Sequence, residues 1–175
     1  MDRGSQDERY LSAAAEYGPA LERLARGYEA DPDQRGDLLQ EIHLALWRSI
    51  AGFDGRCSLR TWVYRVAHNA ASSHVLRRRR AKSAKSASLE ELELVSDGTD
   101  PEQLASEHQV LARLMAMIRA LGPPDAQVML LYLEDMDAAS IGEITGLSAR
   151  AVATKIHRIK AILAKRFQEG GRNDH

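Results

Sequence analysis

The segment IGEITGLSARAVATKIHRIKAIL, residues 141–163, carries the clearest local signal in the chain. Two helical stretches meet at Thr145-Gly146-Leu147, where glycine suits the left-handed turn between helices. Ser148 is a preferred N-cap for the second helix, because its hydroxyl can accept a backbone N–H of the first turn. Apolar residues then recur on one helical stripe, at Val152, Ile156, Ile159 and Leu163. This pattern predicts a helix-turn-helix whose second helix enters a DNA major groove.

Composition bounds what the rest of the chain can be. The 175 residues, 44% of them hydrophobic and 28% charged, can form one domain or two small ones with packed cores. The single Cys57 excludes an intrachain disulfide and a Cys-based zinc site, and the six histidines lack paired ligand spacing, so neither metal nor cofactor is expected. A polar N-terminus and no apolar run near about 20 residues predict a cytoplasmic chain without membrane insertion.

Helical periodicity recurs along the chain, and no segment alternates with the period of a strand. Helices are expected near residues 8–28 (kinked or divided at Gly18-Pro19), 35–50, 59–80, 104–118 and 125–133, followed by the helix-turn-helix. Segment 81–103, rich in Ser, Ala and acids, is expected to be a flexible linker. The predicted fold is all-α, with two small helical domains, 8–80 and 104–168, joined by that linker.

The net charge of −1 conceals an uneven distribution. Six basic residues lie between Arg77 and Lys85, whereas Glu90 to Glu107 holds seven acids and neither Lys nor Arg. Such asymmetry can place a nucleic-acid surface on a nearly neutral protein.

The N-terminal half carries a second polar pattern, DLLQEIHLALW at residues 37–47. Residues three and four apart are neighbours on a helix, so Asp37, Gln40 and Glu41 form one patch. Taken alone, the patch is more typical of a solvated helix face than of a binding site. An enzyme that uses Glu41 and His43 is a further alternative, and it would need a pocket around them.

The order of motifs in this half resembles conserved region two of bacterial sigma factors. The matching motifs are Asp37-x-x-Gln40-Glu41, Leu46-Trp47, Phe53, Thr61-Trp62-Val63, Ala67-x-Asn69 and the arginine run from Arg77. Leu121-x-Pro123 with the helix-turn-helix resembles region four. A chain with only these two regions and a linker is similar to the extracytoplasmic-function (ECF) type, over residues 10–80 and 105–167.

The resemblance implies an RNA polymerase sigma factor that directs transcription initiation, not an enzyme with catalytic residues. It implies three partners: core RNA polymerase (its β′ coiled coil and β flap), promoter DNA and an anti-sigma factor. Acids and amides suit a basic helical partner. The implied polymerase-binding residues are Asp37, Leu38, Gln40, Glu41 and Trp47.

The resemblance also implies that the loop before residue 60 and the following helix open the minus-ten element and hold a flipped base. Asn69 can read a base edge, because its amide both donates and accepts, and Ser73 shares its helix face. Trp62 is either a stacking surface or a core anchor, and the arginines either bind phosphates or end a helix. The implied minus-ten residues are Asp54, Gly55, Arg56, Ser58, Leu59, Trp62, Arg65, Asn69, Ser73, Arg77 and Arg78.

For the minus-thirty-five element the resemblance implies the helix that starts at Ser148. Residues near its N-terminus would reach base edges and later basic residues would hold phosphates. The base readers expected here are Arg150, Ala153, Thr154 and Lys155, and the phosphate contacts are His157 and Arg158. The implied minus-thirty-five residues also include Ser148.

Some positions depart from the family pattern. They are His43 where Phe is frequent, Ser73 where Asp or Asn is common, Gly142 where Ala is usual, and Arg150-Ala151-Val152 where Gly-Thr-Val is frequent. Glycine inside a helix costs up to ~1 kcal/mol. These departures bear on the promoter sequence, and a stand-alone helix-turn-helix regulator stays open as an alternative function.

Overall fold

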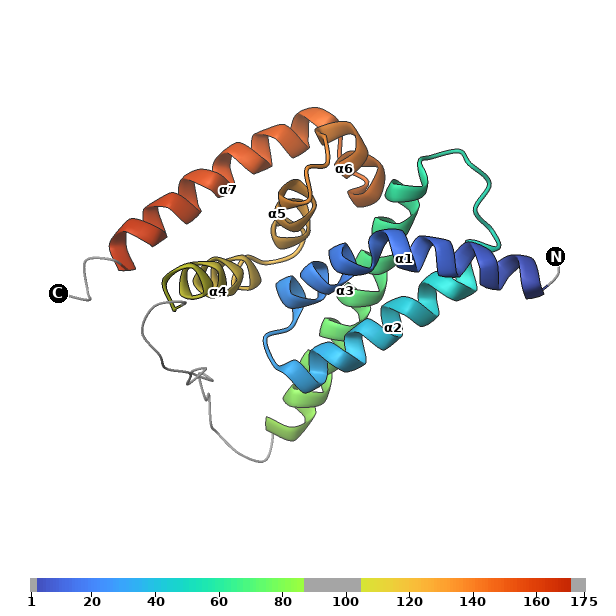
Figure 1. Ribbon diagram of the computed structural model, residues 1–175. Coiled ribbons are helices and arrows are strands. Elements are labelled where there is room, and N and C mark those ends of the chain that lie inside the picture. The colour runs from blue at the N-terminus through green and yellow to red at the C-terminus, as the bar shows by residue number, and fades with distance from the viewer. Residues whose placement is uncertain (1–2, 87–104, 171–175) are drawn as a thin grey trace.

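The computed structural model describes residues 3–86 and 105–170, and all regular structure in these residues is helical (Figure 1). The predicted all-α class is therefore confirmed. The N-terminal half contains α1 (Arg3–Tyr28), α2 (Pro32–Ile50) and α3 (Leu59–Ser86). The C-terminal half contains α4 (Ala105–Arg119), α5 (Asp125–Leu133), α6 (Ala138–Thr145) and α7 (Ala149–Gly170).

Several helix ends differ from the prediction, and α2, for example, begins at Pro32 rather than near residue 35. Helix α3 continues through residues 81–86, which were expected to begin the linker; the rest of the predicted linker lies outside the described residues. Helix α1 begins at Arg3, and Pro19 lies inside it rather than between two helices. The early start of α1 has a tertiary cause: Gln6 donates to the carbonyl oxygen of Trp47 at 2.7 Å, so the first turns of α1 are held against α2.

Local chemistry explains where α2 begins. The carboxylate of Asp31 accepts the backbone N–H groups of Asp33 and Gln34 at 2.9 and 3.0 Å, as an N-cap does. Pro32 follows in the first turn, where its missing N–H costs no helical hydrogen bond. The buried stripe of the helix consists of Leu38, Ile42, Leu46 and Ile50.

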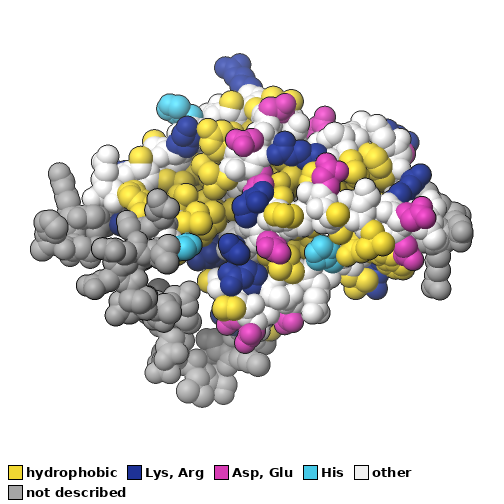
Figure 2. All heavy atoms as spheres, viewed as in Figure 1, with side chains coloured by type: hydrophobic (Ala, Val, Ile, Leu, Met, Phe, Trp, Pro, Cys, Tyr) yellow, Lys and Arg dark blue, Asp and Glu magenta, His cyan; other side chains and the backbone are white. Residues whose placement is uncertain are grey.

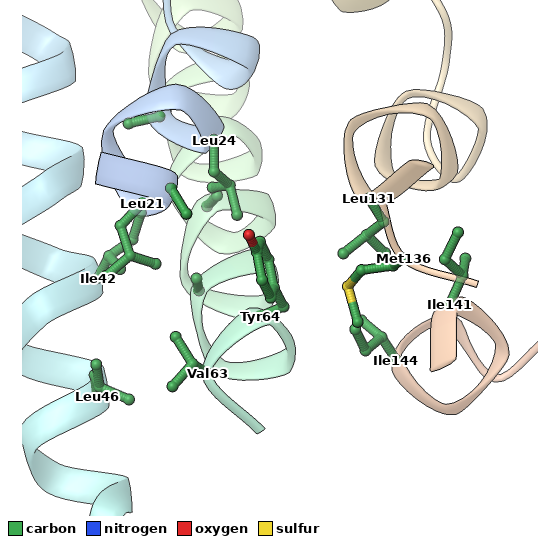
Figure 3. Close-up of a cluster of buried hydrophobic side chains, with 14 of the residues drawn as sticks. Leu21, Leu24, Ile42, Leu46, Val63, Tyr64, Leu131, Met136, Ile141 and Ile144 are labelled. Carbon is green, nitrogen blue, oxygen red and sulfur yellow. The ribbon is translucent and has the colours of Figure 1, made fainter. Parts of the chain in front are cut away.

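The two halves of the chain share one hydrophobic core. Figure 3 shows Leu21, Leu24 and Tyr64 of the N-terminal half facing Leu131, Met136 and Ile141 of the C-terminal half. Helix α1 packs against α4, and α3 packs against α6. A second cluster joins α4, α5 and α7 through Ile118, Met129 and Ile159. The halves that the sequence suggested as separate domains therefore lie in direct contact.

The helix-turn-helix forms as the sequence predicts. Gly146 ends α6 in the left-handed conformation with φ 77°, and the Ser148 hydroxyl accepts the Ala151 N–H at 3.2 Å. Val152, Ile159 and Leu163 are buried, and Ile156 is partly buried. The predicted N-cap, turn and apolar stripe are confirmed, and the opposite face of α7 lies in solvent.

Candidate polymerase and promoter interfaces

One exposed face of α2 carries part of the predicted polymerase site. Asp37 and Gln40 are exposed there, and Leu44 is 46% exposed one turn further along. Leu38 is fully buried beneath them, which corrects its assignment as a docking residue. Leu44 was missed, although its spacing of four from Gln40 was a usable signal.

Glu41 and Trp47 have partners inside the chain. Glu41 accepts from His74 at 3.1 Å and from Arg77, and these hydrogen bonds from α3 lower the pKa of Glu41 despite the opposing effect of partial burial. The indole N–H of Trp47 donates to Asp7 at 2.7 Å, so Trp47 anchors the start of α1. Asp37, Gln40 and Leu44 are thus the residues of this face that remain most open to a partner, and we call these three the α2 face.

The predicted minus-ten loop is a set of short turns before α3. Asp54 binds the Arg56 side chain at 2.8 Å, and Gly55 is left-handed with φ 77°. The Ser58 hydroxyl caps α3 by accepting the Thr61 N–H at 3.0 Å, and Leu59 is half-buried against the core. The loop therefore holds Asp54, Gly55 and Arg56 at the surface.

On α3 the predicted residues fall into an exposed and a packed group. Asn69 and Ser73 are exposed on the same face, one turn apart. Trp62 is half-buried and meets Phe53 edge-on at 5.6 Å, so it serves as a core anchor. Arg65 is half-buried as well. The Trp62 Nε1 and Arg65 Nε atoms are buried without a hydrogen-bond partner among the described residues.

The arginines that end this group are engaged within the fold. Arg77 binds Glu41, as described above, and both side chains stay substantially exposed. Arg78 binds Glu29, whose side chain is only 10% exposed, so this pair ties α3 to the end of α1. We therefore assign Arg78 a structural role in place of the predicted phosphate contact. Figure 2 shows basic and acidic side chains interspersed on the visible face.

On α7 the N-terminal turns of the second helix project outward. Ser148, Arg150, Ala153, Thr154 and His157 are all exposed. Ser148, Arg150, Ala153 and Thr154 lie at the N-terminal end of this helix, the part of the second helix that reaches base edges in helix-turn-helix proteins, and His157 lies further along.

Lys155 and Arg158 are held by the first residue of α5. Each donates to a different carboxylate oxygen of Asp125 at 2.7 Å. Burial raises the pKa of Asp125, but these two cations outweigh it and bring the net pKa below its usual value. Lys155 thereby leans back toward α5, and its expected role as a base reader depends on release from Asp125.

Two negative findings concern residues 3–86 and 105–170. No helix there is both long and apolar enough to span a bilayer. No three His, Cys, Asp or Glu side chains in those ranges gather in a way that could hold a metal ion.

Comparisons with known proteins follow the same division of the chain. Residues 13–81 match the family model of sigma-70 region 2, and residues 111–163 match that of sigma-70 region 4. The RNA polymerase sigma factor NccH of Alcaligenes xylosoxydans xylosoxydans is 27% identical over 174 residues, 95% of this chain and 91% of NccH. The ECF RNA polymerase sigma factor SigW of Bacillus subtilis (strain 168) is 27% identical over 178 residues, which cover 97% of this chain and 94% of SigW.

The chain belongs to the ECF sigma factors. Solved structures agree with the fold of this sigma factor. CnrH, in complex with the cytosolic domain of CnrY, superposes with a TM-score of 0.67 at 20% identity, covering 96% of this chain and 97% of CnrH. The sigma factor RpoE of Bartonella quintana, in complex with the anti-sigma factor NepR, superposes with a TM-score of 0.71 at 15% identity. The superposition covers 91% of this chain and 96% of RpoE.

Membership decides between the functions that the sequence left open. The sigma factor acts in DNA-templated transcription initiation, and nothing in the comparisons supports a stand-alone regulator. Sigma factors are DNA-binding transcription factors and not enzymes.

Proposed function

We propose that this sigma factor binds core RNA polymerase through the α2 face and grips a promoter at two places. Residues 8–80 would bind and open the minus-ten element, and residues 104–168 would bind the minus-thirty-five element. The observation that carries the proposal is the exposure of Asp37, Gln40 and Leu44 on one side of a helix whose other side is buried.

The chemistry of the α2 face suits a helical, basic partner. Leu44 offers apolar surface, and Asp37 and Gln40 beside it can accept hydrogen bonds from Arg or Lys side chains. The β′ coiled coil of core polymerase is the partner proposed for this face, and the β flap is proposed for the C-terminal half. Because both proposed partners belong to RNA polymerase, we propose that the protein acts in the cytoplasm.

For the minus-ten element we propose Asn69 and Ser73 as readers of the opened strand, with the loop residues Asp54, Gly55 and Arg56 beside them. The amide of Asn69 can satisfy both a donor and an acceptor of a base edge. For the minus-thirty-five element we propose Arg150, Ala153 and Thr154 as base contacts and His157 as a phosphate contact. Exposure of all these side chains supports the assignment.

We also propose an anti-sigma partner, as RpoE and CnrH were each solved with a bound protein. A cavity of about 590 Å³ lies between the two halves of the chain. Its walls include Leu111, Met115 and Leu130, and arginines such as Arg26 and Arg35 stand around it. This combination fits an amphipathic helix with acidic residues.

The test of the central proposal is Asp37→Ala. Removing a charged partner from the α2 face should weaken binding of the full chain to core polymerase by about tenfold or more, because hydrogen bonds to charged groups contribute about 1.5–3 kcal/mol. Fluorescence anisotropy of labelled protein titrated with core polymerase measures the effect. Glu22→Ala, which removes an exposed acid from α1, is the matched control. Equal affinities for the two variants would exclude the α2 face as the polymerase site.

A further inference from the structure

Glu134, at the C-terminal end of α5, connects the two halves of the chain through four hydrogen bonds. Its carboxylate accepts two parallel bonds from Arg23 of α1, each 2.7 Å long, and a third from the Tyr64 hydroxyl of α3 at 2.9 Å. Its backbone carbonyl accepts the fourth from Arg60. The Glu134 side chain is only 12% exposed. We call these four residues the Glu134 clasp.

The clasp stands within a larger contact between the halves. A Cβ atom added to Gly27 of α1 would lie 2.3 Å from a methyl group of Leu130, so α1 and α5 are in close contact here and a larger residue at position 27 would force the Leu130 side chain to move. Arg119 of α4 donates to the backbone carbonyl of Arg26 at 2.8 Å. The Arg23 side chain is 55% exposed, but its two parallel hydrogen bonds reach a carboxylate that is mostly buried, and this geometry makes the pair stronger than a fully solvated surface pair.

The closed arrangement conflicts with a grip on two promoter elements. Elements named minus ten and minus thirty-five are centred about 25 base pairs apart, which is about 85 Å of straight duplex at 3.4 Å per pair. A compact chain of 175 residues has a radius of gyration of about 16 Å, and is therefore about 40 Å across. One closed molecule cannot reach both elements with α3 and α7.

We propose that the Glu134 clasp holds the sigma factor in a closed resting form, which opens between α1–α3 and α4–α7 before both promoter elements are bound. The proposal rests on the two-point promoter grip proposed above. In the closed form Arg23, Arg60 and Tyr64 are engaged by the C-terminal half. Opening releases these groups and separates the proposed minus-ten and minus-thirty-five surfaces.

The direct test measures the dimensions of the full chain without polymerase or DNA. Glu134→Gln keeps the shape of the side chain but removes the charge that Arg23 binds. The ratio of closed to open molecules should then fall by about tenfold, and small-angle X-ray scattering should record a larger radius of gyration. Glu143→Gln, an exposed acid of α6 in the same half, is the control and should leave the radius unchanged.

Two further variants separate the clasp from a general loss of folding. Tyr64→Phe removes one of the four bonds and should increase the radius in the same direction by a smaller amount. Gly27→Leu leaves every charge in place but adds a side chain where Leu130 already packs, so it should open the contact as well. Helical content from circular dichroism should remain that of the unaltered chain in all of them. Unchanged radii in both Glu134→Gln and Gly27→Leu would overturn the proposal.

A second measurement concerns function. Glu134→Gln should form a complex with core polymerase and a promoter carrying both elements faster than the unaltered chain, by about the same tenfold factor. If the variant opens in solution yet forms the complex at the unaltered rate, the clasp has no regulatory role and the proposal is wrong. If neither protein joins core polymerase, the proposed function fails, whereas the scattering result still decides whether the clasp holds the chain closed.

Discussion

His68 is a buried histidine whose ionisation opposes folding. It is 1% exposed, its Nδ1 lies 2.7 Å from the Tyr28 hydroxyl, and burial lowers the pKa of His68 to about 3. The unfolded chain binds a proton near pH 6.5, whereas the folded chain does not until about pH 3. Stability from the neutral imidazole is therefore complete above pH 6.5 and is lost as the pH falls from there toward 3.

We predict that the unaltered chain loses about 2 kcal/mol more unfolding free energy than His68→Gln between pH 6.5 and 5, since one proton changes stability by about 1.4 kcal/mol per pH unit. Urea unfolding at several pH values measures this difference. Glutamine can keep a hydrogen bond to Tyr28 but does not titrate. Parallel stability curves for the two proteins would mean that His68 accepts a proton in the folded state.

At Gly142, close packing outweighs the higher helix propensity of alanine. A Cβ atom at this position of α6 would lie 2.6 Å from the backbone carbonyl oxygen of Leu147, in the turn before α7. Alanine, the better helix former, would push the turn away from α6. The departure from the usual family alanine is thus explained by close packing of the helix on its own turn.

We predict that Gly142→Ala lowers the unfolding free energy by about 1–2 kcal/mol, since overpacking against backbone outweighs the gain in helix propensity. Thermal and urea unfolding measure the change. Gly36→Ala in α2 is the matched control, because nothing lies within 4 Å of its added Cβ, and it should stabilise by about 0.5–1 kcal/mol. If Gly142→Ala instead raised the unfolding free energy, the turn at Leu147 would have to move away from the added methyl group without loss of stability.

At the scale of elements, α5 controls the charge that α7 presents. Asp125, at the start of α5, binds both Lys155 and Arg158, and its single negative charge offsets one of these two positive charges on the helix proposed to bind DNA. The first turn of α5 also gains from an acid, because backbone N–H groups there are unpaired. A basic helix assigned from sequence alone is therefore less positive in the folded protein.

We predict that Asp125→Asn strengthens binding to an unrelated duplex and steepens its salt dependence by up to about two released ions, as Lys155 and Arg158 become free to reach phosphates. Discrimination in favour of a minus-thirty-five duplex should fall, because contacts of the freed Lys155 and Arg158 to phosphates strengthen binding to every duplex alike. Anisotropy titrations between about 50 and 200 mM salt measure the slope of log affinity against log salt concentration. Asp135→Asn alters net charge equally away from α7, and an equal effect there would contradict the assignment.

At the scale of the whole molecule, the proposed promoter contacts lie on separate halves. Asn69 belongs to α3 of the N-terminal half and Arg150 to α7 of the C-terminal half (Figure 1). Substitutions in the two halves should therefore affect different steps of initiation.

We predict that Asn69→Ala slows promoter opening about tenfold and leaves recruitment unchanged, because base capture contributes only once strands separate. Arg150→Ala should weaken recruitment by about 1–3 kcal/mol and leave the opening rate unchanged. Filter binding and permanganate footprinting separate the two steps. Gln168→Ala, further along α7, is the control. Loss of the same step in both variants would contradict the division between halves.

Much of the fold follows from spacing along the chain. The stripe from Val152 to Leu163, the cap at Ser148 and the turn at Gly146 are local features, and they were predicted because helix periodicity, capping and left-handed turns depend on neighbours a few residues away. The motif from Asp37 to Glu41 likewise identified the family. Helix ends were predicted less well, since Trp47 holds the start of α1 from 40 residues away.

By itself, the sequence determined the all-α class, the helix-turn-helix and membership among sigma factors, because these depend on local periodicity and on the order of motifs. Only the tertiary structure decided which motif residues face solvent: Leu38 is buried, Leu44 is exposed, and Arg78 is bound to Glu29. It alone placed Glu134 against Arg23 and Tyr64, more than 60 residues away in the chain. Such contacts depend on how helices pack across the core, which spacing within one helix does not encode.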